Sequence, residues 1–396
     1  MKILRKYLHD KRVIFARWRV HFRRENKLLV LSIKRKFQFL MTKPLGRKPN
    51  FLIGPTNSAN QGTAWSQALT RFGANSESLR ISANPAGEWF TTDISIPREK
   101  WLTFDYRQEL ANSVASSKEI VLIESLRPIF RLRNVRDSNH QVLEDFTLLT
   151  RIGKRAGVIF HGSDIRDVDA HALRNPYSPF KSDRPEIEDL RKRSNQNRAI
   201  LPELRNRGLP IFVSTKDLLL EVPDAHWLPV TIDFPRFNAV AKSSPIYTGA
   251  DTKLRVLFLP SRSWLKSAEL IEPVLLKLVS EGIIAYESFT SGGENIKHDQ
   301  IPDLIAKNDV VIDQYLGVIG VFPIEALAAG RIVLSYVPEA DAEVPIISIT
   351  PQTLESELRR IAKDRPLPHG GVEYAERWHD GRESVKAIAK VFNFRV

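Results

Sequence analysis

The residue pattern with the clearest chemistry is a glycine loop followed by a short helix that carries a glutamate. Gly317 and Gly320 lie in the loop, and Gly330 marks the end of the helix about two turns later. Pro323 suits the first helical position, where its missing N–H has no partner to lose. Such a helix tip binds anions because free backbone N–H groups and the helix dipole both point outward. Since Glu325 in the first turn can accept hydrogen bonds from sugar hydroxyls, the pattern predicts a phosphate beside a ribose, as in nucleotide-sugar binding.

A pair of cations at the end of another predicted strand is the second candidate. The apolar run Val256–Leu259 is followed by Arg262 and Lys266, and a helix then extends to about Ser280. Lys266 falls near the N-terminus of that helix, where a cation opposes the dipole. The position becomes favourable if a diphosphate lies between Lys266 and the helix tip. Arg262 can then form a bidentate contact with the diphosphate oxygens. The alternative is a pair of solvated surface cations.

The third candidate follows the apolar run Gly157–Phe160. His161 opens the polar segment HGSDIR, which ends at Arg166. A polar run with a glycine at the carboxyl end of a parallel strand suits a sugar or an acceptor hydroxyl, and His161 is the catalytic candidate there. In the alternative interpretation the segment is a turn in which Asp164 caps the next element. The sequence has no cysteine, and no metal site is predicted from the three histidines that stand without metal-ligand spacing, His226, His298 and His379.

Parallel α/β units position these candidates. Short apolar runs alternate with helix-like segments, which predicts parallel sheets. The first unit is the strand Phe51–Ile53, the polar loop Gly54–Gly62 and a helix from about Thr63 to Arg71. It is of Rossmann type but lacks the tight three-glycine fingerprint, so we expect no dinucleotide, and we take Gly62 as a ligand-binding candidate. The polar segment Asn238–Lys253, punctuated by proline and glycine, indicates a linker.

Charge divides the chain into an extension and a body. A chain of 396 residues with 42% apolar residues is long enough for two domains with ordinary cores. Residues 1–48 hold 16 Lys and Arg against Asp10 and Glu25, a net charge of +14, whereas the whole chain carries +13. The body is therefore close to neutral. Since it has no basic excess of its own, we expect no nucleic-acid partner.

The extension has the pattern of a basic amphipathic helix. Its apolar residues, Trp18 and Phe22 among them, mostly recur at intervals of three, four or seven, and cations occupy the other faces. The longest uncharged run, Leu28–Ile33, is far too short to span a bilayer, and charges interrupt every possible signal-peptide core. Such a helix lies at an anionic membrane surface, so we expect a cytoplasmic protein associated peripherally with the inner face of the membrane. In the alternative interpretation, the helix packs against the body or a partner.

Taken together, these motifs resemble glycosyltransferases of the GT-B double-Rossmann fold, the large retaining class that includes the sucrose and glycogen synthases. The resemblance spans about residues 49–394. It is carried by the strand-end element Pro260-Ser261-Arg262 to Lys266-Ser267, the glycine loop and EA-x-A-x-G helix from Gly320 to Gly330, the closing segment Leu228–Asp233, the pair His161-Gly162, and Trp378-His379-Asp380.

This resemblance implies a fold class and a division of the chain. The fold is α/β, with two Rossmann-like domains that face a central cleft, here an acceptor domain over 49–240 and a nucleotide-sugar domain over 250–375. Residues 376–396 return as a helix to the first domain, and 1–48 form the extension. The implied activity moves a sugar from a nucleotide-diphosphate-sugar donor to a glycan or lipid-linked acceptor, as in cell-envelope or polysaccharide synthesis, with no metal and no cofactor.

The resemblance also assigns roles to the site residues. Arg262 and Lys266 hold the donor diphosphate, and His161 faces the donor sugar. Nucleotide binding falls to Gly320, Val321 and Glu325, with Glu325 on the ribose, and to Gly62 in the first domain.

Two departures from the family pattern prompt an alternative function. The family has two glutamates separated by seven residues, and the first of them would stand where this chain has Gly317. The segment that closes the first domain, Leu228–Asp233, lacks the usual Asn-Gly. One alternative is a catalytically weakened protein of the same fold that acts as a binding or scaffold subunit. Another is a sugar-nucleotide epimerase or a phosphorylase on the same fold, although a phosphorylase would need a pyridoxal-bearing lysine and a much longer chain.

Overall fold

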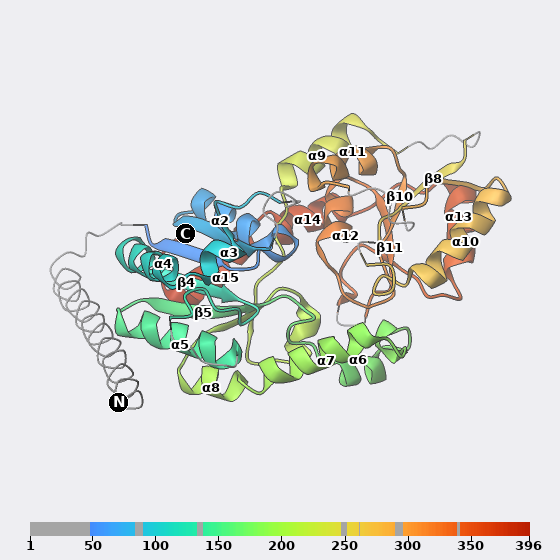
Figure 1. The fold of residues 1–396 in the computed structure, drawn as a ribbon. Helices are drawn as coiled ribbons and strands as arrows, with labels where there is room; N and C mark the ends of the chain where they lie inside the picture. Colours follow the sequence, from blue (N-terminus) through green and yellow to red (C-terminus); the bar gives the residue numbers. More distant parts are fainter. Residues whose placement is uncertain are drawn as a thin grey trace, which may run out of the picture.

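The computed structural model describes residues 48–83, 90–132, 138–246, 252–260, 262–289, 296–338 and 341–396. They form two α/β units that lie side by side (Figure 1). The predicted extension lies outside the described residues apart from Lys48, and so does Ser261 beside Arg262. Within the ranges described, no helix combines the length and the apolar character needed to cross a bilayer.

The first unit is built on a seven-stranded parallel sheet in the order β3-β2-β1-β4-β5-β6-β7. Both faces of the sheet are covered: in β1, Leu52 belongs to one core, whereas Phe51 and Ile53 belong to the other. This double burial explains why the central strands read as continuous apolar runs. The strands are β1 Asn50–Gly54, β2 Asn75–Ser82, β3 Ile94–Pro97, β4 Ile120–Glu124, β5 Arg155–Phe160, β6 Ile211–Val213 and β7 His226–Trp227.

Helices pack on both faces of this sheet (Figure 1). The core on one face includes side chains of α3, α4, α5 and α8, and the core on the other face those of α2 and α15. The helices of this unit are α2 Gln61–Arg71, α3 Arg98–Leu102, α4 Phe104–Ser117, α5 Ser138–Arg151, α6 Val168–Arg174, α7 Pro185–Arg198, α8 Leu201–Asn206 and α15 Arg382–Phe392.

The second unit has a five-stranded parallel sheet in the order β12-β11-β10-β8-β9. Side chains of α10 and α13 pack on one face, and those of α9, α11, α12 and α14 on the other. The strands are β8 Leu254–Phe258, β9 Ile284–Tyr286, β10 Val310–Ile312, β11 Ile332–Ser335 and β12 Ile347–Ser348. The helices are α9 Phe234–Ser243, α10 Ala268–Ser280, α11 Ile301–Ala306, α12 Val321–Ala328, α13 Leu354–Asp364 and α14 Gly371–His379.

The chain crosses between the units twice, and the two crossings are bonded to each other. The backbone N–H of Ile232 donates to the carbonyl of His379 over 2.9 Å, and His379 Nδ1 bonds the carbonyl of Val230 over 2.7 Å. Trp65 of α2 donates from Nε1 to the carbonyl of Pro229 over 2.9 Å, which ties this connection to the first unit. These hydrogen bonds join residues that are far apart in the sequence at the boundary between the two units.

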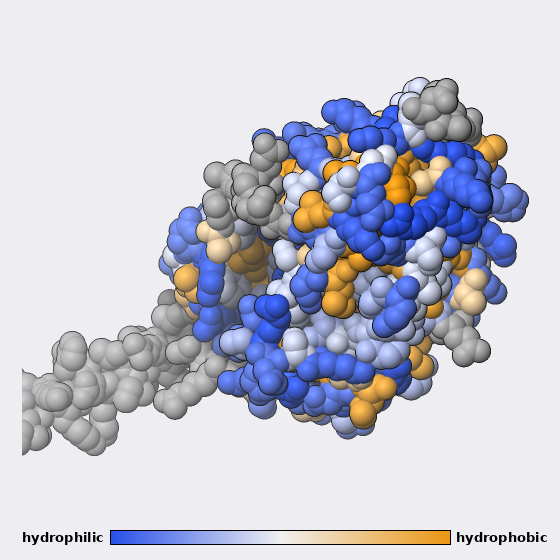
Figure 2. Space-filling view, turned by 90° about the vertical axis from the view of Figure 1, so that its right-hand side faces the viewer, coloured by the Kyte–Doolittle hydropathy of each residue, from blue (hydrophilic) through white to orange (hydrophobic). Residues whose placement is uncertain are grey.

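The structure confirms the predicted parallel α/β organisation and corrects one segment. Asn238–Lys253 was expected to be a linker, but α9 continues to Ser243. The helix persists because Phe237 and Val240 are buried against α11, α12 and α14, so tertiary packing outweighs the polar composition. On the face that Figure 2 shows, the surface is mostly polar, with smaller apolar groups between the polar ones.

Candidate functional site

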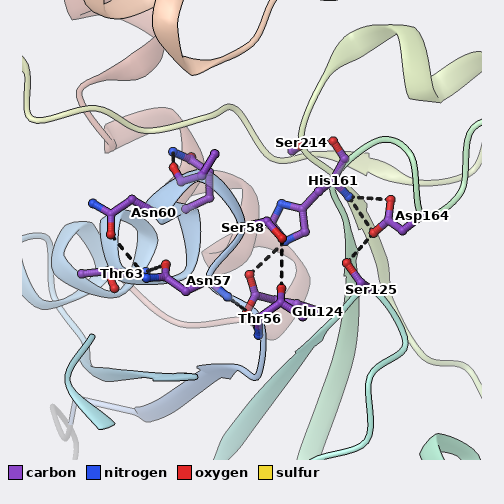
Figure 3. A network of polar contacts seen from close by, with 12 residues as sticks. Thr56, Asn57, Ser58, Asn60, Thr63, Glu124, Ser125, His161, Asp164 and Ser214 are labelled. Carbon is purple, nitrogen blue, oxygen red and sulfur yellow. Dashed lines mark hydrogen bonds and ion pairs between the residues drawn. The ribbon is translucent and has the colours of Figure 1, made fainter. Parts of the chain in front are cut away.

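His161 and Glu124 form a pair at the carboxyl ends of two neighbouring strands (Figure 3). Glu124 is the last residue of β4 and is fully buried, and His161 follows β5 directly. Nε2 of His161 lies 2.9 Å from Oε1 of Glu124. The imidazole also stacks on Trp65, with ring centroids 5.6 Å apart and planes at 19°. Two contacts thus fix the ring, while Nδ1 points away from Glu124 and makes no hydrogen bond with the described residues.

The two groups favour each other's charged form. Burial opposes the charged imidazole, but the hydrogen bond and the charge of Glu124 outweigh it and raise the pKa of His161 above its ordinary value. Burial would likewise raise the pKa of Glu124, yet the bond and charge of His161 and two backbone N–H donors bring that pKa below its ordinary value. An imidazolium held in this way can donate a hydrogen bond from Nδ1 to a ligand hydroxyl.

The turn after His161 is stabilised by Asp164. The Asp164 carboxylate accepts from the backbone N–H of His161 over 3.0 Å and from that of Gly162 over 2.8 Å. Asp164 therefore stabilises a turn, as the alternative interpretation of this segment proposed. Its side chain, however, accepts hydrogen bonds from the residues before it and does not cap the next element. Arg166 donates to Asp217 over 2.6 Å. Both charged residues of the segment are thus already partnered within the protein.

The polar loop between β1 and α2 folds onto Glu124. Oε2 of Glu124 accepts from the backbone N–H of Thr56 over 2.9 Å and of Asn57 over 2.8 Å. Asn57 Oδ1 in turn accepts from the backbone N–H of Thr63 over 2.9 Å, as Figure 3 shows. Gly62 is buried in this turn, where a Cβ would lie 3.3 Å from Asn57 and 3.4 Å from Glu124. Close packing of α2 on the loop thus accounts for the glycine, and its ligand-binding role stays a prediction.

The tip of α12 is open where the predicted glycine loop enters it. Gly320 is the N-cap residue, and a Cβ there would meet nothing within 4 Å among the described residues. The helix begins at Val321, two residues earlier than Pro323 had suggested. Pro323 is consequently the third helical residue, and Glu325 lies at the start of the second turn and not in the first. The helix ends as predicted before Gly330, whose φ is +65°.

Glu325 is buried and bonded to a histidine. Its Oε1 lies 2.7 Å from Nε2 of His298, whose ring is 5.0 Å from that of Phe90. Burial raises the pKa of Glu325 above its ordinary value, although the hydrogen bond and charge of His298 act in the opposite direction. Oε2 makes no hydrogen bond with the described residues. Glu325 therefore keeps one oxygen without a hydrogen-bond partner among the described residues, and its ribose-binding role stays a prediction.

A cavity of about 90 Å³ lies where the two units meet. The second unit contributes Val321, Glu325 and His298 to its wall, and the first contributes Gln61 of α2. Thr231 of the crossing segment orients Gln61. The Gln61 side-chain amide accepts from the backbone N–H of Thr231 over 2.7 Å and donates to the carbonyl of Thr231 over 3.0 Å. The predicted ribose-binding glutamate thus shares a cavity with residues of the other unit.

Lys266 is paired with a buried aspartate. Its Nζ lies 2.5 Å from Oδ1 of Asp313, the residue that directly follows β10. Oδ2 of Asp313 is buried and has no hydrogen-bond partner in the described part of the chain. Arg262 is exposed and forms no salt bridge with the described residues. Both cations lie between β8 and α10, but the charge of Lys266 is already shared.

Gly317 occupies a position where a larger residue would not fit. Its φ is +73°, and a Cβ would lie 3.2 Å from the ring of Tyr336 and 3.3 Å from Nδ2 of Asn175. Asn175 Nδ2 and His171 Nε2, both from the first unit, donate to the carbonyl of Leu316 over 2.8 and 2.9 Å. Burial lowers the pKa of His171 to about 4, so this donor is a neutral imidazole. The space for the missing carboxylate is therefore filled by protein.

Three partner residues escaped the sequence reasoning. They are Glu124, Asp313 and His298. Glu124 and Asp313 each directly follow an apolar run, and this position at a strand end is the signal that could have found them. His298 carries no such signal. No cluster of His, Asp and Glu suited to a metal ion occurs in the ranges described.

The two-sheet architecture matches solved structures. HepE of Anabaena, solved with UDP and glucose, has a TM-score of 0.50 and 10% identity, over 88% of this chain and 100% of that chain. The fold is GT-B. The predicted fold class is thereby confirmed for the two units. AviGT4, a glycosyltransferase involved in avilamycin A biosynthesis, has a TM-score of 0.47 and 13% identity, over 87% of this chain and 97% of that one.

An epimerase is also among the solved structures to which the chain is similar. The UDP-GlcNAc 2-epimerase from Neisseria meningitidis, bound to UDP-GlcNAc, has a TM-score of 0.43 and 11% identity, over 87% of this chain and 99% of that one. No protein-family model and no curated protein sequence matches the chain. At this level of identity the GT-B likeness establishes the fold, and the activity has to be argued from the site.

Proposed function

We propose that the protein transfers a hexose from a nucleotide-diphosphate-sugar donor to a glycan or lipid-linked acceptor. The observation that carries this proposal is the cavity at the domain boundary, where Glu325 and the tip of α12 meet Gln61 of α2. Donor and acceptor bound to different domains require a shared boundary of this kind. HepE, which has a similar fold, was solved with UDP-glucose. This analogy of fold supports a nucleotide sugar as the donor.

In this reaction the second domain stabilises the leaving diphosphate. The open backbone at Gly320 allows close approach to the N-terminus of α12, and Arg262 and Lys266 supply positive charge where negative charge develops. The diphosphate competes with Asp313 for Lys266, since the two now lie 2.5 Å apart. In the class that the chain resembles, no metal or cofactor is needed. Oε2 of Glu325 accepts a hydrogen bond from the ribose.

The first domain positions the sugar. The imidazolium of His161 donates from Nδ1 to a hydroxyl of the donor sugar, and Glu124 holds the ring through Nε2. Fixed donors of this kind act by orienting the reacting groups before reaction. Retention of configuration at the anomeric carbon follows from the resemblance to the retaining class.

The setting we propose is cell-envelope or polysaccharide synthesis at the cytoplasmic face of a membrane. Support comes from the net charge of +14 over residues 1–48 and from the apolar stripe of that segment. A membrane-bound acceptor would then lie on the same surface as the protein, so the extension would raise its local concentration.

A catalytically weakened binding protein is the second candidate. Two observations favour it: the space beside Gly317 is filled by Tyr336 and Asn175, and Lys266 is already neutralised by Asp313. Both features remove groups that would stabilise the reacting sugar and its leaving group. Such a protein would still bind the nucleotide through Glu325 and the helix tip.

Two measurements on the full chain separate these candidates. Thermal unfolding with UDP, GDP and ADP identifies the base, because a nucleotide at 100 times its dissociation constant adds about 2.7 kcal/mol of stability. The chain is then incubated with a nucleotide sugar of that base, and NMR follows the released sugar and its anomeric configuration. The matched variants are Glu325→Ala and, as control, Glu373→Ala at an exposed position of α14.

Each outcome has a distinct meaning. Slow release of sugar, lost in Glu325→Ala but kept in Glu373→Ala, supports the transferase. Binding without release supports the binding protein. Absence of any nucleotide effect on unfolding would refute the donor site itself, and a released sugar of inverted configuration would refute retention.

A further inference from the structure

A second cavity, of about 300 Å³, lies in the first domain between the end of β4 and α7. Its wall includes Arg127, from the segment after β4, and Lys192 and Arg193 of α7. Among the described residues of that wall, Asp189 is the one that is acidic. The volume is about ten times the share of one water molecule in the liquid, so it accommodates a polyatomic ion and part of the group that bears it.

The three cations of this cavity lack salt-bridge partners. None of Arg127, Lys192 and Arg193 forms a salt bridge with a described residue. Burial and the nearby like charge of Arg193 lower the pKa of Arg127, while the charge of Asp164 acts in the opposite direction, so Arg127 and Arg193 repel each other. An anion placed between them would relieve this repulsion.

The larger cavity at the other end of the sheet makes an instructive contrast. It measures about 680 Å³ and is also lined by cations, including Arg205 and Lys154. There, however, Arg205 forms a two-bond pair with Asp224, and Lys154 donates to the carbonyl of Lys118. Its cations are satisfied within the protein, whereas those beside α7 are not.

The 300 Å³ cavity adjoins the turn that carries His161. Ser125 and Asn197, two more of its wall residues, both bond to Asp164. Ser125 Oγ donates to Oδ2 of Asp164 over 2.6 Å, and Asn197 Nδ2 donates to its backbone carbonyl over 2.7 Å. Asp164 in turn accepts from the backbone N–H of His161. A ligand in this cavity therefore contacts the residues that hold the His161 turn in place.

We propose that this cavity binds a phosphate group, and that this phosphate belongs to the acceptor. Planar guanidinium groups match the oxygens of phosphate, and a carboxylate offers fewer acceptors for the three cations that line the cavity. The cavity lies in the domain opposite the donor helix α12, which is where an acceptor would bind. The assignment of the phosphate to the acceptor rests on the proposed sugar transfer, whereas phosphate binding itself does not.

The test compares two doubly substituted full-length chains. One carries Arg127→Gln with Arg193→Gln, and the control carries Arg98→Gln with Lys363→Gln, which removes the same charge from two exposed positions elsewhere. Unfolding temperature is measured against inorganic phosphate, with sodium chloride keeping the ionic strength constant. We expect phosphate to raise the unfolding temperature of the natural chain and of the control. Loss of two charged hydrogen-bond donors should weaken phosphate binding in the cavity variant at least about tenfold.

A second arm identifies the source of the phosphate. The same three proteins are sedimented with phosphatidylcholine vesicles that contain phosphatidic acid. All carry the extension, so a difference between the cavity variant and the control reports on the cavity. Reduced sedimentation of the cavity variant supports a lipid-borne phosphate, and unchanged sedimentation with a lost thermal response supports a water-soluble phosphate ester.

An equal thermal response to phosphate in all three proteins would overturn the proposal. The substitutions break no salt bridge among the described residues, so we expect folding to survive. If the double variant does not fold, Arg193→Gln alone, at an exposed position of α7, decides by the same comparison. Failure of phosphate binding leaves the sugar transfer standing, since donor hydrolysis is measured without an acceptor. Failure of donor hydrolysis leaves the phosphate site standing but removes its assignment to the acceptor.

Discussion

Replacing Glu124 by glutamine removes one negative charge from the buried end of β4 without changing the size of the side chain. The carboxylate accepts three hydrogen bonds, from His161 Nε2 over 2.9 Å and from the backbone N–H groups of Thr56 and Asn57 over 2.9 and 2.8 Å. The glutamine oxygen can keep the two backbone donors. Its amide nitrogen, however, is itself a donor and repels a protonated His161.

The cost of Glu124→Gln therefore depends on pH. In the natural chain the pKa of His161 is raised, so the stability that the pair contributes is full below the ordinary histidine pKa and is lost as pH rises through the raised value. In the variant, burial without the carboxylate lowers the pKa of His161, so the variant loses stability as pH falls. At about pH 6 we expect the free energy of unfolding to fall by about 2–4 kcal/mol. This estimate lies between the cost of an unsatisfied buried donor and the cost of a broken buried ion pair.

Above the histidine pKa the penalty should shrink. A neutral His161 can accept from the glutamine amide through Nε2, so all three hydrogen bonds are restored and we expect a loss below about 1 kcal/mol at about pH 9. The measurement stays above pH 5, where Glu124 is ionised in the folded natural chain because its pKa is below the ordinary value. Urea unfolding followed by tryptophan fluorescence at four pH values gives the free energies, with Glu373→Gln as an exposed control. A penalty that is the same at every pH would show that His161 is neutral in the folded chain, and the ion-pair interpretation would be wrong.

Four further predictions concern the rest of the site and the extension. Glu325→Ala should weaken nucleotide binding by about 1.5–3 kcal/mol, measured by calorimetry, and an unchanged affinity would leave Glu325 only the role of holding His298. Lys266→Ala should lower kcat/KM for donor hydrolysis about 10²-fold and also cost stability, because Asp313 then becomes an unpaired buried charge. Gly317→Glu should lower the unfolding free energy by more than about 1 kcal/mol, since its φ is +73° and its surroundings are filled; a neutral effect would refute the close packing. The full chain should sediment with anionic liposomes in a salt-sensitive way. Substitution of Trp18 and Phe22 by aspartate should reduce the sedimentation, although the chain keeps its excess of cations. Equal sedimentation of the variant and the natural chain would show that the apolar stripe does not contribute to membrane binding.

Local sequence was sufficient to predict strands and helix ends wherever a residue's conformation or burial follows from its neighbours in the chain. Strands such as Phe51–Ile53 and Val310–Ile312 are apolar at every position because helices cover both faces of the sheets, and this pattern is legible without coordinates. The stop at Gly330 was equally legible, since a φ of +65° favours glycine. Alternation of such strands with helices was enough to predict two parallel α/β units.

Tertiary structure alone decided which charged groups meet. His161 and Glu124 are 37 residues apart, His298 and Glu325 are 27 apart, and Lys266 is 47 from Asp313, yet each pair is in hydrogen-bond contact. For the first and third pairs, parallel strands make this possible, because their carboxyl ends gather at one edge of a sheet whatever the length of the connection between them. The end of α9 was misjudged for a related reason: burial against distant helices, not composition, sets how far that helix extends. The same long-range packing brings Arg127 and Arg193 to one cavity without salt-bridge partners among the described residues, which their positions in the sequence do not reveal.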